Sequence, residues 1–349
     1  SSIPRWFKAR PDGTIQYAEN PPKKYQDIYP INFESDDWRG LWAALKGVFE
    51  FWIARGVTVF RVDNPHTKAF GFWDWVIGEL REETPELIFL AEAFTRPKRM
   101  YRLAKGGYTQ SYTYFAWRNG PAELRAYVEE LASAPVSDFF RPNFWPNTPD
   151  ILTDYLRDGG RAGSMARFVL AATLVPSFGM YGPSFELCDV RQRPGSEENL
   201  DNEKYEIRTW DLDDRWSLRH LIAAVNTIRR EHASLQHMTN IAFHDCDNPA
   251  HLAYSKTAPD GTDTVLCVVN TNPHEGHGGV VRMNLGAMGI GHAEPFCVVD
   301  LLTGREFRWR GPDQFVELGP GLSHVLHVRR ESGEPAGVVD APPAERVRG

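Results

Sequence analysis

The fold is decided by Gly56-Val57-Thr58-Val59-Phe60-Arg61-Val62-Asp63-Asn64-Pro65-His66. Its apolar, β-branched first part is typical of a buried parallel strand, and its polar second part is typical of a strand end. In α/β folds, the carboxyl ends of such strands carry the chemistry. Arg61 and Asp63 lie two residues apart, so they share one face of a strand, where the arginine favours an ionised carboxylate. A structural Arg–Asp pair at a strand end is the alternative interpretation.

A second strand pattern, residues 87–94, also ends in a carboxylate, Glu92. One crossover helix is predicted between the two strands from the helical spacing of Phe72, Trp75, Val76, Glu79 and Leu80. Neighbouring parallel strands would bring Asp63 and Glu92 to the same rim. A third acid, Asp150, closes the segment 141–150. Two carboxylates that flank a scissile bond are the groups used in glycoside chemistry.

These three segments resemble regions two, three and four of the α-amylase superfamily, glycoside hydrolase family 13. Those regions lie at strands four, five and seven of a catalytic (β/α)8 barrel. Within the superfamily, longer segments resemble the family of α-1,4-glucan:maltose-1-phosphate maltosyltransferases, namely residues 18–30, 61–68, 91–97, 109–115, 193–198 and 202–206. Thr148-Pro149 stands where most of the superfamily has a histidine before the acid. The maltosyltransferases share this change.

The resemblance implies a retaining transfer of a maltosyl unit from α-maltose 1-phosphate to the end of an α-1,4-glucan, with release of inorganic phosphate. It implies that Asp63 is the nucleophile, Glu92 the acid/base and Asp150 the transition-state stabiliser, with Arg61 beside the nucleophile. It implies six donor-binding residues, Asn20, Lys23, Tyr25, Asn64, Lys204 and Tyr205. From the sequence alone, Lys23 and Lys24 are equally well read as solvated surface residues. No metal or cofactor is expected.

The expected fold class is α/β, comprising about strands four to eight of the barrel followed by an antiparallel β-sandwich. We predict strands at 111–115, 139–144 and 175–182, and helices at 36–55, 66–83, 96–105, 121–134, 161–175 and 216–230. The helix 36–55 is expected to bury a stripe that includes Val48 and Trp52. Residues 11–34 are expected to form an irregular loop. The predicted domains are a catalytic portion, 1–238, a β-sandwich, 239–330, and a disordered tail, 331–349.

Composition limits the possible partners. The chain has 349 residues and a net charge of −7, which argues against nucleic acid or an anionic membrane as the main partner. The cysteines at positions 188, 246, 267 and 297 have no metal-binding spacing, so reduced thiols in a cytoplasmic protein are expected. We interpret His274, His277 and His292 as surface residues on turns. The resemblance implies a homodimer.

Three other interpretations stay open. An α-amylase-type hydrolase or a trehalose-forming transglycosidase would use the same acids without the 20–25 phosphate loop. A non-catalytic glucan-binding fragment would bind sugar without turnover, and a plain α/β protein would do neither. The superfamily's first region, an Asp with a nearby His, is not found ahead of Asp63. The chain is therefore expected to be the C-terminal portion of a longer enzyme.

Overall fold

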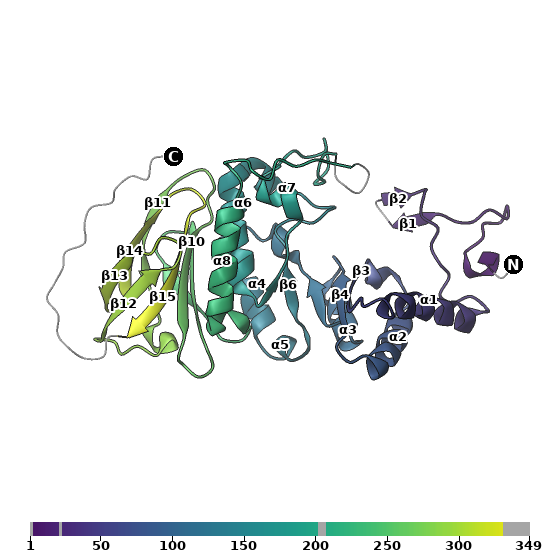
Figure 1. The fold of residues 1–349 in the computed structure, drawn as a ribbon, viewed down its shortest axis with the longest axis horizontal. Helices are drawn as coiled ribbons and strands as arrows, with labels where there is room; N and C mark the ends of the chain where they lie inside the picture. Colours follow the sequence, from purple (N-terminus) through teal and green to yellow (C-terminus); the bar gives the residue numbers. More distant parts are fainter. Residues whose placement is uncertain (1–2, 21–22, 202–206, 331–349) are drawn as a thin grey trace.

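The computed structural model describes residues 3–20, 23–201 and 207–330. Figure 1 shows a parallel sheet with its helices in the middle and an antiparallel sheet at one end, with the N-terminal segment at the other. The N-terminal segment contains a 3-10 helix, η1 (Ile3–Trp6), and a small hairpin of β1 (Ala18–Asn20) and β2 (Lys23–Tyr25). Residues 11–34 were predicted to be a loop too irregular for a helix or a long strand, and their described part contains only these two strands of three residues each. The predicted disordered tail, 331–349, lies outside the described residues.

Five parallel strands follow one another in sequence order across one sheet. They are β3 (Val59–Asp63), β4 (Ile88–Glu92), β5 (Gln110–Tyr112), β6 (Pro142–Phe144) and β7 (Ser177–Phe178). The helices between them are α2 (Phe70–Glu83), α3 (Pro97–Lys105), α4 (Pro121–Ala132), α5 (Val136–Phe139) and α6 (Asp154–Leu174). Strands that alternate with helices in this way carry their chemistry at one rim, because every strand runs in the same direction.

Several predicted strands are shorter than the apolar pattern suggested. The pattern at 139–144 becomes a helical turn, α5, followed by three residues of β6. At 175–182 only β7 pairs, and α7 (Gly182–Glu186) begins soon after it with Pro183 in its first turn. At 111–115, β5 ends and η3 (Tyr114–Trp117) begins. The Thr113 hydroxyl accepts a hydrogen bond from the Phe115 N–H at the start of η3. Each shortening occurs where proline or a capping side chain favours a helical start.

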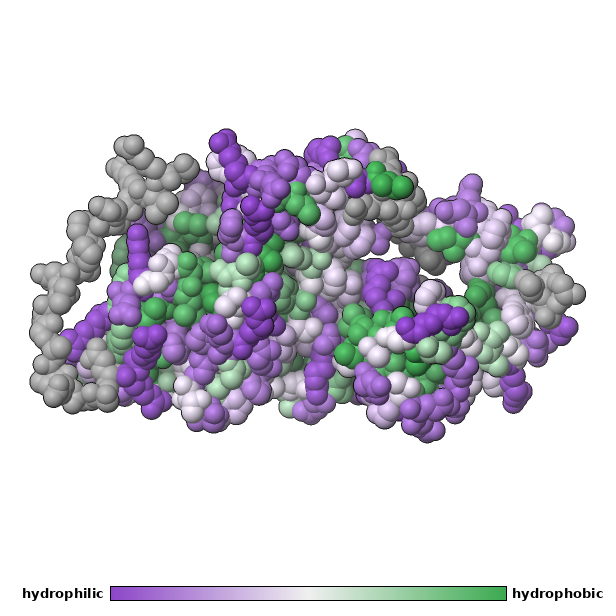
Figure 2. Space-filling model, viewed as in Figure 1, coloured by the Kyte–Doolittle hydropathy of each residue, from purple (hydrophilic) through white to green (hydrophobic). Residues whose placement is uncertain are grey.

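Helix α1 (Trp38–Ile53) forms as predicted, but two residues of its predicted buried stripe are exposed. Val48 and Trp52 are 55% and 48% exposed, so the prediction that they are buried was wrong. As predicted, the helix packs Trp42, Leu45, Phe49 and Ile53 against the cluster formed by α2, β3 and β4. Figure 2 shows hydrophobic surface over this part of the molecule.

Two long helices join the parallel sheet to the antiparallel sheet (Figure 1). In α6, residues 166–174 are all buried, as expected of a helix that is covered on every side. It contacts α8 (Arg219–Glu231) on one side and β10 on another. The largest core cluster includes side chains from α4, α6, α8 and the antiparallel strands. The two parts of the chain therefore share one apolar core.

The chain from residue 241 to residue 330 forms eight antiparallel strands. They are β8 (Ile241–Cys246), β9 (His251–Thr257), β10 (Thr264–Asn270), β11 (His277–Arg282), β12 (Pro295–Asp300), β13 (Glu306–Arg310), β14 (Asp313–Leu318) and β15 (Ser323–Arg330), in the order β13-β12-β15-β10-β9-β8-β11-β14. The 3-10 turn η4 (Ala233–Gln236) precedes β8, and η5 (Leu285–Met288) lies between β11 and β12. A further 3-10 turn, η2 (Pro65–Thr67), follows β3 in the parallel sheet. The predicted α/β class followed by antiparallel strands is confirmed. Strand β8 was not predicted.

Candidate active site

Asp63 and Glu92 occupy matching positions at the ends of adjacent strands. β3 and β4 are parallel, and their register pairs Asp63 with Glu92. The backbone N–H of Asn64 then donates to the Glu92 carbonyl at 3.0 Å, which continues the pairing one step beyond β3. One oxygen from each of Asp63, Glu92 and Asp150 lies within 4.8 Å of the others. The structure therefore brings the three predicted acids together.

Arg61 lies between the three carboxylates. It donates to Asp63 Oδ1 at 3.0 Å, and its Nη2 lies 3.6 Å from Glu92 Oε1 and 3.9 Å from Asp150 Oδ2. Burial tends to lower the pKa of this guanidinium, but the charges of Glu92 and Asp63 outweigh burial and raise it. The three acids are close enough to share a metal ion, and Arg61 already supplies a positive charge to each of them.

Glu92 differs from Asp63 in its surroundings. The Glu92 side chain is 6% exposed and that of Asp63 is 60% exposed, because β4 lies inside the sheet and β3 at its edge. Burial raises the pKa of Glu92 to about 7, against the opposing effect of Arg61 and with a smaller contribution from Asp63. A carboxyl group of this kind exchanges its proton near neutral pH, as a general acid requires.

Asp150 is held by a loop rather than by a strand. Its backbone N–H donates to Thr148 Oγ1 at 3.2 Å, and the Asn199 amide donates to the Thr148 carbonyl at 3.2 Å. Glu197 also holds the loop around Asp150, because it accepts hydrogen bonds from Trp117 Nε1 at 2.8 Å and from the Asp154 N–H at 3.1 Å. Glu197 and Asn199, which follow α7, thus support the third acid.

Asn64 links the two strand ends through both its backbone and its side chain. Its Nδ2 donates to Asp63 Oδ2 at 3.2 Å and its N–H also approaches Glu92 Oε2 at 3.4 Å. The residue has a φ of 46°, in the left-handed region that asparagine tolerates better than most residues. This conformation turns the chain sharply after Asp63 and leaves the carboxylate at the rim.

Two residues at this rim were not assigned a role from the sequence. The pKa of Lys68 is lowered by burial, which outweighs the attraction of Asp63. The Tyr112 ring lies 5.8 Å from the Arg61 guanidinium and stacks on Trp145 at 4.7 Å. Tyr112 ends β5, the strand after Glu92, so its position at a strand end was the available signal.

The predicted donor-binding residues are only partly placed. Asn64 belongs to the acid cluster, whereas Tyr25 is in β2, whose sheet partner is β1. The backbones of Asn20 and Lys23 pair with each other in that hairpin, and their side chains lie outside the described part of the structure. Lys204 and Tyr205 also lie outside the described residues. A role for these residues in holding phosphate stays a prediction.

Comparison with known sequences shows which proteins this chain resembles. Residues 243–328 match the family model "GLGE, C-terminal". The chain is 54% identical over 337 residues to the α-1,4-glucan:maltose-1-phosphate maltosyltransferase of Chlorobaculum tepidum, covering 94% of this chain and 50% of the relative. It is 52% identical over 335 residues to the Salinibacter ruber protein of the same name, covering 96% and 50%. Over most of its length this chain is therefore similar to these maltosyltransferases. It spans about half the length of these curated relatives.

Solved structures show the fold relationship. A maltogenic α-amylase, AmyB, from Thermotoga neapolitana superposes with a TM-score of 0.69 at 14% identity, covering 95% of this chain and 73% of that one. An α-amylase from Geobacillus thermoleovorans gives a TM-score of 0.66 at 13% identity, with coverage of 88% and 68%. At such identities the likeness concerns the fold alone. This chain thus has a fold similar to that of α-amylases.

Proposed function

We propose that this chain carries the catalytic acids of a retaining maltosyltransferase, which moves a maltosyl unit from α-maltose 1-phosphate to an α-1,4-glucan and releases phosphate. The observation that carries the proposal is the in-register pair of Asp63 and Glu92, whose oxygens lie within 4.8 Å. A retaining mechanism uses carboxyl groups about 5–5.5 Å apart, whereas an inverting one needs about 6.5–9.5 Å. The short separation favours double displacement.

Asp63 is proposed as the nucleophile, since its carboxylate is exposed and paired with Arg61 at 3.0 Å. It attacks the anomeric carbon, and the bond to phosphate breaks to leave a β-maltosyl ester. Glu92 donates its proton to the departing phosphate oxygen and later removes the proton from the acceptor 4-hydroxyl. Asp150 stabilises the positive charge that develops on the sugar ring in each transition state.

The donor phosphate needs a separate group of contacts. We assign this role to Asn64, beside the nucleophile, and to Asn20, Lys23 and Tyr25 of the β1–β2 hairpin, because amide, ammonium and phenol donors suit phosphate oxygens. Lys204 and Tyr205 are assigned to the second glucose of the donor. The names of the relatives, which include maltose 1-phosphate and α-1,4-glucan, support this choice of substrates.

The proposal extends to the architecture and setting. We infer that β3 to β7 correspond to strands four to eight of a (β/α)8 barrel, that residues 1–238 form the catalytic portion, and that residues 239–330 form a β-sandwich. We further propose a homodimer that acts in the cytoplasm. Among the described residues, no helix is long and apolar enough to cross a membrane. No metal or cofactor enters the proposed steps.

The test is phosphate release from α-maltose 1-phosphate with maltohexaose as acceptor. The assay uses the chain by itself and the chain joined to the remaining half of the Chlorobaculum tepidum relative, since that relative is about twice as long as the match. The complete relative is the positive control. Acceptor-dependent release that Asp63→Ala abolishes would support the transferase. Absence of release from the joined protein, with the relative active beside it, would refute it.

A second candidate is an α-amylase-type hydrolase, which the fold likeness to AmyB favours. It would use the same three acids but would not need a phosphate-binding hairpin. Two assays, one with starch and one with maltose 1-phosphate, distinguish the hydrolase from the transferase. A hydrolase would liberate reducing sugar from starch and ignore maltose 1-phosphate, and Lys23→Ala would leave its rate unchanged. The transferase would lose donor affinity in Lys23→Ala.

A further inference from the structure

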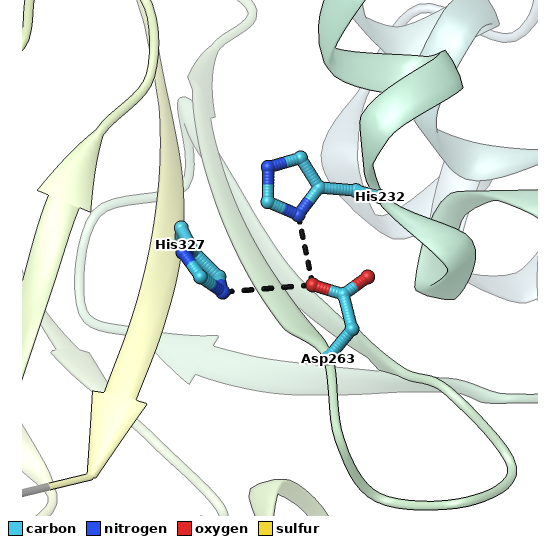
Figure 3. A group of neighbouring side chains, drawn as sticks. All are labelled: His232, Asp263 and His327. Atoms are coloured by element: carbon cyan, nitrogen blue, oxygen red, sulfur yellow. Dashed lines mark hydrogen bonds and ion pairs between the residues drawn. The ribbon is translucent and has the colours of Figure 1, made fainter.

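A second cluster of ionisable side chains lies far along the chain from the acids. His232 follows the last residue of α8, Asp263 precedes β10 in the turn after β9, and His327 belongs to β15. Figure 3 shows the two imidazole rings pointing at one carboxylate oxygen of Asp263 from separate elements. Spacings of this length form no motif, so sequence patterns could not reveal the cluster.

The distances between the nitrogen and oxygen atoms of these three side chains suit a shared metal ion. His232 Nδ1 lies 2.8 Å and His327 Nε2 lies 3.6 Å from Asp263 Oδ1, and the three ligand atoms all lie within 4.8 Å of one another. Tetrahedral zinc with bonds of about 2.1 Å separates its ligand atoms by about 3.4 Å. A hydrogen bond explains the contact of His232 but not that of His327, because 3.6 Å exceeds hydrogen-bond range.

The carboxylate is oriented by a neighbouring backbone group. The Ser234 N–H donates to Asp263 Oδ2 at 2.8 Å, which leaves Oδ1 to face both rings. The ring centroids are 4.7 Å apart with an angle of 60° between their planes, so both nitrogens approach the same point without stacking. Fixing a ligand through its second oxygen is a common feature of metal sites. The three side chains are 11%, 15% and 24% exposed, which shields the site without sealing it.

A cavity of about 280 Å³ adjoins the cluster and gives an entry path. His327 lines it together with Thr262, Thr264 and Arg329. The charges of Arg329 and of Arg330, which also lines the cavity, oppose a cation, although Arg329 pairs with Glu306 at 3.8 Å. Three protein ligands leave a fourth position, which a water molecule in this cavity would fill.

We propose that His232, Asp263 and His327 form a binding site for a divalent transition metal, with Zn²⁺ as the ion that best matches two imidazoles and a carboxylate. Such a set also suits Fe²⁺. The bound ion joins the end of α8 to the β9–β10 turn and to β15. It would therefore stabilise the junction between the helical layer and the antiparallel sheet, separately from any transferase chemistry.

The first experiment is zinc titration of the chelator-treated protein by calorimetry, with thermal unfolding measured alongside. One Zn²⁺ per chain is expected, with a rise in Tm that Mg²⁺ does not produce. His327→Ala and His232→Ala should each weaken zinc binding at least tenfold. His237→Ala is the matched control, because His237 is exposed in the same segment, and it should bind zinc as the parent does.

A second measurement does not depend on the stability of a variant. Histidine NMR resonances of the unaltered protein should change on zinc addition for His232 and His327 among the 11 histidines. Co²⁺ should give visible absorption bands that Asp263→Asn, which keeps the side-chain volume, abolishes. Absence of zinc binding, or binding that moves other histidines and survives His327→Ala, would overturn the proposal. The cluster would then be a hydrogen bond between His232 and Asp263 with His327 beside it.

Discussion

Two buried groups, Glu92 and Lys256, have a pKa of about 7, and they reach it from opposite directions. Burial raises the pKa of Glu92 from 4.5 and lowers that of Lys256 from 10.5. Glu92 belongs to a rim of charged side chains, whereas Lys256 lies in β9 and donates to the Leu174 carbonyl at 3.3 Å at the end of α6. Burial thus suits Glu92 to its proposed role as a proton donor, whereas the buried Lys256 holds a backbone carbonyl at the end of a helix.

The surroundings explain this difference. At the rim, Arg61 faces three carboxylates, and the charges compensate one another beside solvent. Near Lys256, Arg229 donates to the backbone carbonyls of Ala172, Val175 and Pro176, with the last contact at 2.6 Å. A charge that is paired with backbone carbonyls satisfies helix-end groups and fixes packing. We therefore expect rim substitutions to reduce activity and substitutions around Arg229 and Lys256 to change stability.

The largest expected effect is on catalysis. Glu92→Gln removes the proton donor and should reduce phosphate release by about 10²–10⁴-fold. Tm at pH 8 should be unchanged or higher, since the variant no longer ionises a buried carboxyl. Steady-state rates and thermal unfolding of the same preparation measure both quantities. A fall in Tm with only a modest loss of rate would place Glu92 among structural residues.

Arg229→Ala should lower the stability of the protein without lowering its activity, which is the opposite of Glu92→Gln. It leaves buried carbonyls at the end of α6 without their donor and should lower the free energy of unfolding by about 3 kcal/mol. Urea denaturation measures the change, and the rate per folded molecule should stay the same. Arg230→Ala is the matched control, because Arg230 is exposed on the same helix and should change stability by less than about 0.5 kcal/mol. Equal losses in both variants would contradict the assigned role.

Lys256→Met should raise stability at pH 7 by about 1–2 kcal/mol, since a buried ammonium without an acid partner is replaced by an apolar chain. The unfolded state binds more protons at this residue between pH 7 and 10.5, so the parent gains stability as pH rises through that window. The variant should lack this gain. Denaturation at several pH values tests the difference, and parallel pH curves would exclude Lys256 as its source.

The smallest expected effect is a change in the pH dependence of the rate on the alkaline side of pH 7, which is the alkaline limb of the profile. With the pKa of Glu92 at about 7, the protonated acid is lost above that pH and the rate should fall about tenfold per pH unit. The pH dependence of kcat/KM measures this limb in the free enzyme. Arg61→Met should move it to higher pH, because the charge of Arg61 lowers the pKa of Glu92. A limb that stays in place would assign the titration to another group.

The sequence predicted the rim better than it predicted the helix–sheet junction. Asp63 and Glu92 could be placed together because parallel strands in register bring their ends to one edge. Arg229 and Lys256 gave no such signal, since a basic residue in an amphipathic helix or strand is usually exposed. The exposure of Val48 and Trp52 on α1 was also missed, because this helix has more large apolar side chains than the one face that packs against the sheet can bury.

The central claim, that Asp63 forms a covalent bond to the sugar, is best tested by trapping that intermediate. Glu92→Gln treated with α-maltosyl fluoride, whose leaving group needs no proton, should accumulate protein heavier by one maltosyl unit. Peptide mass spectrometry should locate the added mass on Asp63, and the double variant with Asp63→Ala should stay unlabelled. A label on a different residue, or a double variant labelled as fully as Glu92→Gln, would contradict the account.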